Sequence, residues 1–226
     1  AHRVAGGQAR QPPRQTAVEP PPAGEKMVEV KGPGETTYLQ VAYHAPAASH
    51  PDFFIFTVLD SLLTGPTSLN MFGGGGISNK TSRLYRSLVE TELAVSVNGG
   101  LSATIDPFLY DITVTVHPGK KHKPALQKLD DEVNRIQDNL VTPEEISRAV
   151  KQARALFAYG SENITNQGFW LGYAEMFAGY DWFINYVSEL GRVTPLELQR
   201  VAREYLRPAN RVVGVYLPET GGRKTR

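Results

Sequence analysis

The stretch that comes closest to a ligand-binding motif runs from Gly74 to Thr81 and reads GGGISNKT. It differs by one residue from the phosphate-binding loop G-x-x-x-x-G-K-[ST], because Asn79 stands where the second glycine belongs. That glycine lets backbone amides turn onto a phosphate, and the motif directly follows a buried strand. Here a helical apolar pattern comes before the run. Nucleotide binding is therefore a distant alternative.

The histidines lack the spacing of a peptidase zinc site. Such sites use two histidines one helical turn apart with a glutamate base, as in H-x-x-E-H. No pair has that spacing among His2, His44, His50, His117 and His122. The chain has no cysteine and no G-x-S-x-G elbow, which removes a thiolate and the common serine nucleophile. We therefore predict no metal ligand and no catalytic residue in this chain.

The N-terminal part combines a linker with two strands and a helix. Residues 1–25 are rich in Pro, Gly, Gln and Arg, which predicts an extended interdomain linker and hence a longer protein. The alternation over Lys26–Lys31 predicts an edge strand, and Thr37–His44 predicts a second strand. A wide apolar stripe after Pro51 predicts a helix that ends before Gly65–Pro66.

The glycine run Gly73–Gly76 predicts a loop, because each glycine loses much backbone freedom in regular structure. A short helix should follow, with one apolar face formed by Leu84, Tyr85, Leu88 and Val89. A half-buried strand should come next, with its apolar face formed by Leu93, Val95 and Val97.

The rest of the chain predicts a hairpin, several helices and a closing strand. Alternating apolar and polar residues over 108–116 predict the second hairpin strand, connected through residues 105–107. Apolar residues spaced three and four apart predict a helix over Lys123–Asn139. Thr-Pro-x-Glu at Thr142 and Thr194 predicts two capping boxes. Residues 163–191 predict two helices broken at Gly179, and their aromatic cluster suits a core, a face buried against a partner domain, or a ligand pocket. Asn210–Leu217 predicts the last strand.

This order of elements predicts an α+β fold: a two-layer sandwich of a mostly antiparallel sheet with helices on one face. We assign residues 26–218 to this domain and 219–226 to a loose tail. The 226 residues have a net charge of +1 and 41% hydrophobic content, typical of a soluble globular chain without a strong field for nucleic acid or membrane. No apolar run is long enough to span a bilayer.

An ordered set of segments resembles one family. GGGG followed by SRLYRSLVE and LAVSV resembles the second, non-catalytic half of the insulinase/pitrilysin/mitochondrial processing peptidase family of zinc metallopeptidases. The linker QPPRQTAVEPP, the strand YLQVAYHAP and the segments VTPEEISRAVKQARALF and VTPLELQRVAREYLRPANRVV occur in the family's order. The similarity extends from residue 11 to 218.

The resemblance implies an α+β domain of the same metallohydrolase fold, which closes like a clamshell with a zinc-bearing half around a peptide. Zinc is expected on that partner half, upstream in the same chain or in a separate subunit, and none on this chain. Many second halves carry an Arg and a Tyr in a stretch like R-E-x-x-G-L-A-Y. Both positions are valine here, Val89 and Val95, so that role is not carried over.

The resemblance thus implies a non-catalytic half that closes the peptide chamber and helps hold an extended peptide, with no activity of its own. The predicted substrate contacts are Gly73, Gly74, Gly75, Gly76, Ser82 and Arg83. The alternative is a binding or assembly module of the same fold without a proteolytic role. We expect peptide as the ligand, no nucleic acid, and a bacterial cytoplasmic or periplasmic location.

Overall fold

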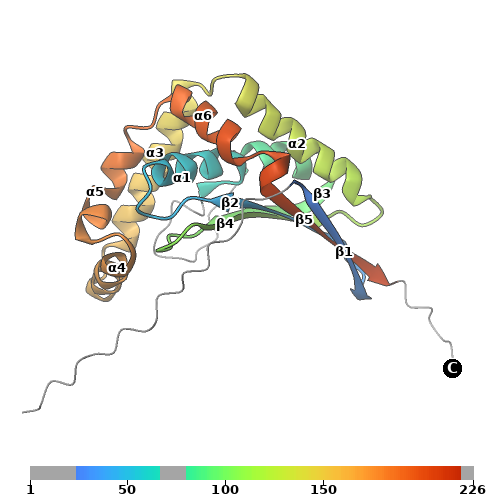
Figure 1. Ribbon diagram of the computed structural model, residues 1–226, viewed down its shortest axis with the longest axis horizontal. Helices are drawn as coiled ribbons and strands as arrows, with labels where there is room; N and C mark the ends of the chain where they lie inside the picture. Colours follow the sequence, from blue (N-terminus) through green and yellow to red (C-terminus); the bar gives the residue numbers. More distant parts are fainter. Residues whose placement is uncertain (1–23, 67–79, 220–226) are drawn as a thin grey trace, which may run out of the picture.

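The computed structural model describes residues 24–66 and 80–219 as one five-stranded sheet with helices on one face (Figure 1). The strand order is β1-β5-β2-β4-β3, so β1 and β3 are the edges. β1 pairs with β5 in parallel and every other pairing is antiparallel. The predicted α+β sandwich is confirmed. The strands are β1 Lys26–Pro33, β2 Tyr38–Ala45, β3 Ala94–Leu101, β4 Phe108–Val116 and β5 Arg211–Glu219.

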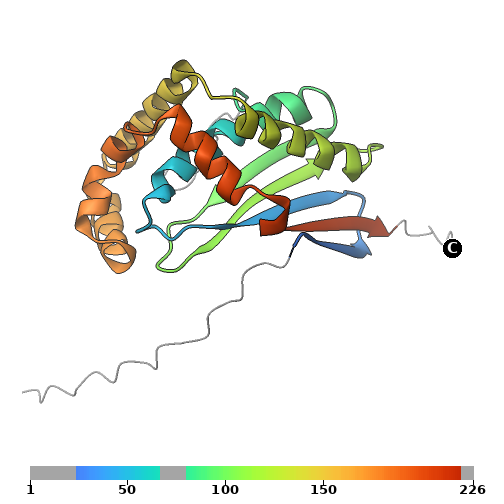
Figure 2. The same ribbon diagram turned by 45° about the horizontal axis from the view of Figure 1, so that its top comes forward.

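The helices form a covering layer that extends past one end of the sheet (Figure 2). Helices α1, α2 and α6 contact the strands, whereas α3 and α5 pack on α1, and α4 packs on α5. None of the described helices has both the length and the apolar character needed to span a bilayer. The helices are α1 Asp52–Leu63, the π-helix η2 Tyr85–Val89, α2 His122–Asp138, α3 Pro143–Gly160, α4 Ile164–Phe177, α5 Tyr180–Leu190, α6 Pro195–Tyr205 and the 3-10 helix η3 Pro208–Asn210.

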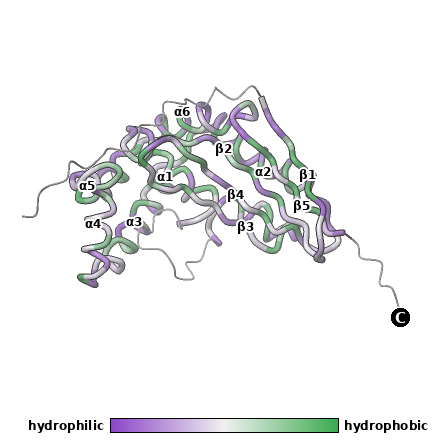
Figure 3. Tube along the Cα trace, turned by 60° about the horizontal axis from the view of Figure 1, so that its bottom comes forward, coloured by the Kyte–Doolittle hydropathy of each residue, from purple (hydrophilic) through white to green (hydrophobic). Residues whose placement is uncertain are grey.

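The core lies between the helices and the three central strands. Alternate residues of a strand face the same side of a sheet, and the helix-facing set is fully buried at Leu39, Val41, Tyr43, Tyr110, Ile112, Val114 and Val213. The edge strand β1 is different, because its Met27, Val28 and Val30 are about half exposed. The hydrophobic stretch at this edge is visible in Figure 3.

The predicted face of β3 is wrong at its start. We expected Leu93, Val95 and Val97 to share the buried face, but Val95 is 54% exposed and Ala94 is 2% exposed. The pairing with β4 shifts register between Ala94 and Ser96. A β-bulge adds one residue to a strand and so reverses the faces on its two sides. Val97 is buried as expected.

Local signals set the helix boundaries. Both capping boxes form as predicted: Glu145 and Glu197 accept hydrogen bonds from the amides of Thr142 and Thr194 at 3.2 and 2.9 Å. Gly179 has a φ of 93° between α4 and α5, a left-handed conformation that favours glycine. The break predicted there is confirmed, and it lets α5 turn back along α4.

Two charge networks join distant parts of the chain. The buried Arg211 of β5 forms ion pairs with Asp130 of α2 and, at 2.7 Å, with Glu25, and it donates to the Tyr43 hydroxyl at 3.1 Å. At the start of α1, Asp52 forms an ion pair with Arg200 of α6. The hydrogen bond from Arg200 holds the pKa of the Asp52 carboxyl below its usual value. The first network fixes α2 to the sheet, and the second fixes α1 to α6.

Candidate functional site

The predicted glycine contacts, Gly73 to Gly76, lie outside the described residues, as do residues 1–23 and 220–226 of the predicted linker and tail. The structure does describe Ser82 and Arg83 at the start of the helical segment that contains η2. The Ser82 side chain is buried, and its hydroxyl accepts a hydrogen bond from the Tyr85 amide at 3.3 Å. A serine that accepts an amide hydrogen bond in this way caps a helix start.

Arg83 connects this helical segment to α3. Its Nη2 lies 3.0 and 3.1 Å from the two carboxylate oxygens of Glu145. Glu145 also belongs to the capping box of Thr142, so one carboxylate serves both the start of α3 and the ion pair. Both side chains are about three-quarters buried. Ser82 and Arg83 are therefore adjacent but have structural partners in this state.

A polar cleft opens beside this ion pair, with a volume of about 270 Å³. Its walls come from the last turns of α1, the segment around η2 and the first turns of α3. Three arginines and a single carboxylate line it, which gives it a positive character. The lining residues are Ser61, Leu62, Thr81, Arg83, Arg86, Thr142, Glu145, Arg148, Ala149 and Gln152. We call it the basic cleft.

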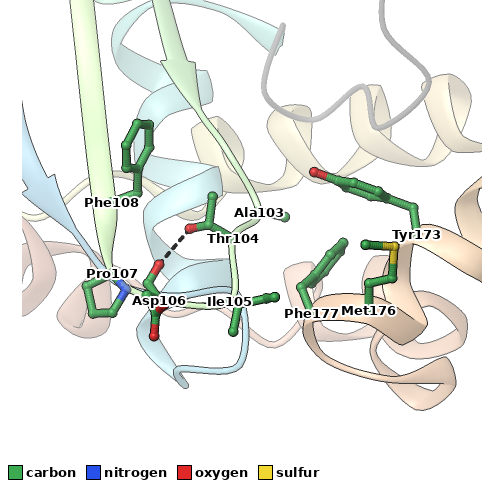
Figure 4. A pocket seen from close by; sticks show the side chains of 9 residues that line it. All are labelled: Ala103, Thr104, Ile105, Asp106, Pro107, Phe108, Tyr173, Met176 and Phe177. Atoms are coloured by element: carbon green, nitrogen blue, oxygen red, sulfur yellow. Dashed lines mark hydrogen bonds between the residues drawn. The ribbon is translucent and has the colours of Figure 1, made fainter. Parts of the chain in front are cut away.

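A second, apolar pocket of about 330 Å³ lies between the β3–β4 loop and α4 (Figure 4). Residues 103–108 form one wall, and Tyr173, Met176 and Phe177 form the other. Its rim is exposed: Ile105 is 62% and Met176 is 70% accessible. Exposed apolar side chains gathered around a concavity indicate a binding surface more often than scattered ones do. We call it the apolar pocket.

Both walls of the apolar pocket are attached to one residue, Ala48, in the connection between β2 and α1. The Ala48 amide donates to the carbonyl oxygen of Thr104 at 2.9 Å. The Ala48 carbonyl accepts from Trp182 Nε1, also at 2.9 Å, and the Trp182 ring packs edge-on against Phe177 at 4.9 Å. The Thr104 hydroxyl donates to the Asp106 carbonyl at 2.7 Å and closes the loop. The pocket is thus built on a fixed frame.

The apolar pocket follows directly from an edge strand. Among the described residues β3 pairs with β4 alone, so one side of its backbone has no strand partner. β3 ends at Leu101 and the pocket wall begins at Ala103. The chain thus passes from the edge strand directly into the pocket wall.

Sequence reasoning found half of this pocket. The aromatic cluster over 163–191 suits a core, a face buried against a partner domain, or a ligand pocket, and the structure divides it. Trp182, Phe183 and Tyr186 are buried, whereas Phe169 and Tyr180 are exposed. The contribution of loop 103–108 was missed, because a short turn-like segment carries no periodic signal. Its Ile105 and Pro107, on either side of Asp106, were the available hint.

No metal centre occurs in the parts of the chain that the structure describes. Within residues 24–66 and 80–219, no three His, Cys, Asp or Glu side chains are close enough together to hold an ion. Two of the described histidines have local hydrogen-bond partners: His50 accepts from the Asp52 amide at 3.1 Å, and His117 Nδ1 lies 2.9 Å from the Pro118 carbonyl. The described site can bind through backbone, apolar and cationic groups.

Solved structures share this fold. A protease from Helicobacter pylori matches with a TM-score of 0.78 and 17% identity over 88% of this chain, which spans only 46% of that protein chain. A proposed zinc protease from Bordetella pertussis Tohama I matches with a TM-score of 0.69 and 26% identity, covering 82% of this chain and 96% of that one. The inactive peptidase domain of a proposed zinc protease from Bordetella parapertussis matches with a TM-score of 0.70 and 25% identity. The match covers 84% of this chain and 95% of that one.

The family model agrees with these structural matches. No curated protein matched the sequence. The family model described as the peptidase M16 inactive domain matches residues 3–153, more than half of the chain. The expected resemblance is thereby confirmed, and this chain belongs to the peptidase M16 inactive domain family.

Proposed function

We propose that this chain is the non-catalytic half of a zinc metallopeptidase, which closes the peptide chamber and helps hold an extended peptide. The zinc site resides on a separate half, in the same protein or in a partner subunit. One observation carries the proposal: in a member of an inactive peptidase family, β3 pairs with β4 alone among the described residues, and the chain continues from its end at Leu101 into the wall of the apolar pocket at Ala103. The edge supplies backbone hydrogen bonds, and the pocket takes one apolar side chain of the peptide.

The composition of the two sheet edges favours β3 over β1 as the peptide-binding edge. Natural proteins protect exposed edges with lysine and proline. β1 contains Lys26, Lys31 and Pro33, whereas β3 reads AVSVNGGL and contains neither residue type. An edge without such protection is suited to pair with another extended chain. Gly100 of β3 adds no side chain that would obstruct a close backbone approach.

The predicted contacts at the glycine run remain part of the proposal. If Gly74 and Gly75 contact peptide, replacing both with Ala should weaken peptide binding more than it lowers the free energy of unfolding. Ser82 and Arg83 would act indirectly, because their polar groups cap a helix and bind Glu145. Equal losses of binding and stability would instead assign the run to packing.

The experiment that tests the proposal compares this chain alone with the chain mixed with its zinc-bearing half. Bound zinc is measured by atomic emission, and peptide cleavage is measured by fluorescence dequenching. We expect no zinc and no cleavage from the chain alone, and cleavage by the mixture that stops when a chelator removes zinc. Zinc-dependent cleavage by the isolated chain would refute the proposal.

The same experiment separates the alternative of a binding or assembly module. A mixture that associates tightly, contains zinc and still cleaves no peptide would favour assembly over proteolysis. The substitution of valine at positions 89 and 95 is the sequence feature behind that alternative. A mixture that cleaves peptide would eliminate it.

A further inference from the structure

The basic cleft contains more positive charge than its surroundings balance. Arg83 is paired with Glu145, which is the one carboxylate among the lining residues. The other two lining arginines, Arg86 and Arg148, are exposed and form no ion pair or hydrogen bond with any described residue. Two guanidinium groups thus line one concavity without a counter-charge.

Two buried polar atoms in the same cleft also lack partners. The hydroxyl of Ser61 and the Nε of Arg83 are both inaccessible to solvent, and neither makes a hydrogen bond. Ser61 as a whole is 6% exposed. A buried donor without a partner is costly, so native proteins rarely keep one unless a ligand or water satisfies it. Both atoms belong to residues that line the cleft, which is the second sign of a ligand site.

The segments outside the described residues contain only one acidic side chain. The segment 67–79, between α1 and the η2 segment, reads TSLNMFGGGGISN and contains no Asp or Glu. Residues 220–226 contain none, and residues 1–23 contain only Glu19. These segments therefore offer little charge to balance the cleft, which leaves it open to an anion from another molecule.

We infer that the basic cleft binds a carboxylate group of the peptide, so that this half of the peptidase selects acidic peptides. The source of the carboxylate rests on the proposed function. The planar guanidinium fork matches a carboxylate through two parallel hydrogen bonds. Arg86 and Arg148 supply the forks, and the Ser61 hydroxyl supplies a third donor deeper in the cleft.

The test measures binding of fluorescent peptides to this chain by anisotropy. One peptide carries a central Glu and has both ends blocked, a matched peptide has Gln in place of Glu, and a third has Gln with a free C-terminal carboxylate. Inorganic phosphate serves as a competitor. We expect the Glu peptide to bind about tenfold tighter than its Gln counterpart, as for one charge-assisted contact. The third peptide shows whether a chain terminus is accepted as well.

The variants locate that preference. Arg86→Gln with Arg148→Gln should abolish the difference between Glu and Gln peptides, and Ser61→Ala should reduce it. Lys31→Gln removes the same kind of charge from β1, at the opposite edge of the sheet, and should leave the preference intact. Circular dichroism confirms that each variant is folded.

Three outcomes overturn the inference. Equal binding of Glu and Gln peptides would remove the carboxylate preference while leaving the proposed peptide-holding role standing. A preference that survives the double arginine variant would place it elsewhere on the chain. Phosphate that binds the cleft while no peptide does would make it a phosphate site and would also count against peptide holding.

Discussion

The helix–sheet interior and the apolar pocket contain similar apolar residues, but the interior buries them and the pocket leaves several exposed. In the interior, β2, β4 and β5 bury their aromatic and aliphatic side chains beneath α1, α2 and α6, and ion pairs fix the helices in place. At the apolar pocket, Ile105, Phe108 and Met176 stay largely exposed on a frame that is itself well anchored. The difference supports the proposal that the pocket binds a peptide, because these exposed side chains contribute little to the core.

This contrast predicts which substitutions should lower stability and which should lower peptide affinity. A change in the interior should lower the free energy of unfolding, whereas a change at the pocket rim should lower peptide affinity and leave stability nearly unchanged. The next four predictions run from the largest expected effect on stability to the smallest.

Arg211→Leu should cause the largest loss in the free energy of unfolding. The substitution leaves Asp130 and the Tyr43 hydroxyl without their cationic partner, and breaking such a pair at a buried site costs about 3 kcal/mol. Urea denaturation measures the loss. Arg207→Leu, at an exposed position near the same strand, is the control and should change stability by less than about 0.5 kcal/mol. Similar values for the two variants would argue against the network.

Gly99→Ala should have the second-largest effect on the free energy of unfolding. A Cβ on Gly99 would lie 2.5 Å from Asp60 Oδ1 and would also collide with the Thr64 side chain. Both groups are buried and hydrogen-bonded to each other at 2.6 Å, so we expect a cost of about 1–3 kcal/mol from overpacking. The neighbouring Gly100→Ala is the matched control, because its nearest contact is 3.2 Å from Asp111 Oδ1. A smaller loss at position 99 than at 100 would contradict the packing of α1 on β3.

Asp52→Asn should lower the free energy of unfolding by about 1 kcal/mol, in a pH-dependent way. The expected loss is modest because the partner Arg200 is half exposed and solvent weakens the ion pair. The hydrogen bond from Arg200 lowers the pKa of Asp52 in the folded state. A lowered pKa gives stability that is present above the unfolded value of about 3.9 and is lost as pH falls through the folded pKa. The stability gap between wild type and variant should therefore persist down to about pH 5 and shrink at lower pH. A gap that widens in acid would show that the ion pair is not its origin.

Met176→Ala with Ile105→Ser should have the smallest effect on stability, below about 0.5 kcal/mol, because both side chains are exposed. Affinity for an extended apolar peptide should fall about fivefold, as expected for losing an apolar contact of about 1 kcal/mol. Thermal denaturation and fluorescence anisotropy measure the two effects. Ile184→Ser on α5 is a control at an exposed apolar position outside the pocket. A pair of substitutions that unfolds the protein would make the pocket part of the core.

Periodic and capping signals were sufficient to predict most of the fold. The stripe after Pro51, the alternation over 108–116, and the Thr142 and Thr194 capping boxes each depend on neighbouring residues alone. The β3 bulge could not be predicted, because pairing with β4 decides where the extra residue lies. The parallel pairing of β1 with β5 could not be predicted from local patterns either, since it joins the two ends of the domain.

The candidate site was less accessible to sequence reasoning. Ser82 and Arg83 were singled out for their position after the glycine run, but their capping bond and their ion pair to Glu145 depend on the fold. The basic cleft combines α1, the η2 segment and α3, and the apolar pocket combines a loop with α4. Residues so far apart in sequence become neighbours only through tertiary packing. Their predicted contact with peptide remains a prediction.

The central claim, that this half holds an extended peptide on β3, is tested most directly by amide hydrogen exchange with and without bound peptide. Exchange should slow along Ala94–Leu101 and in loop 103–108 when peptide is added, while the other edge strand, Lys26–Pro33, exchanges as before. Slower exchange confined to β1, or no change along β3 at saturating peptide, would contradict the account.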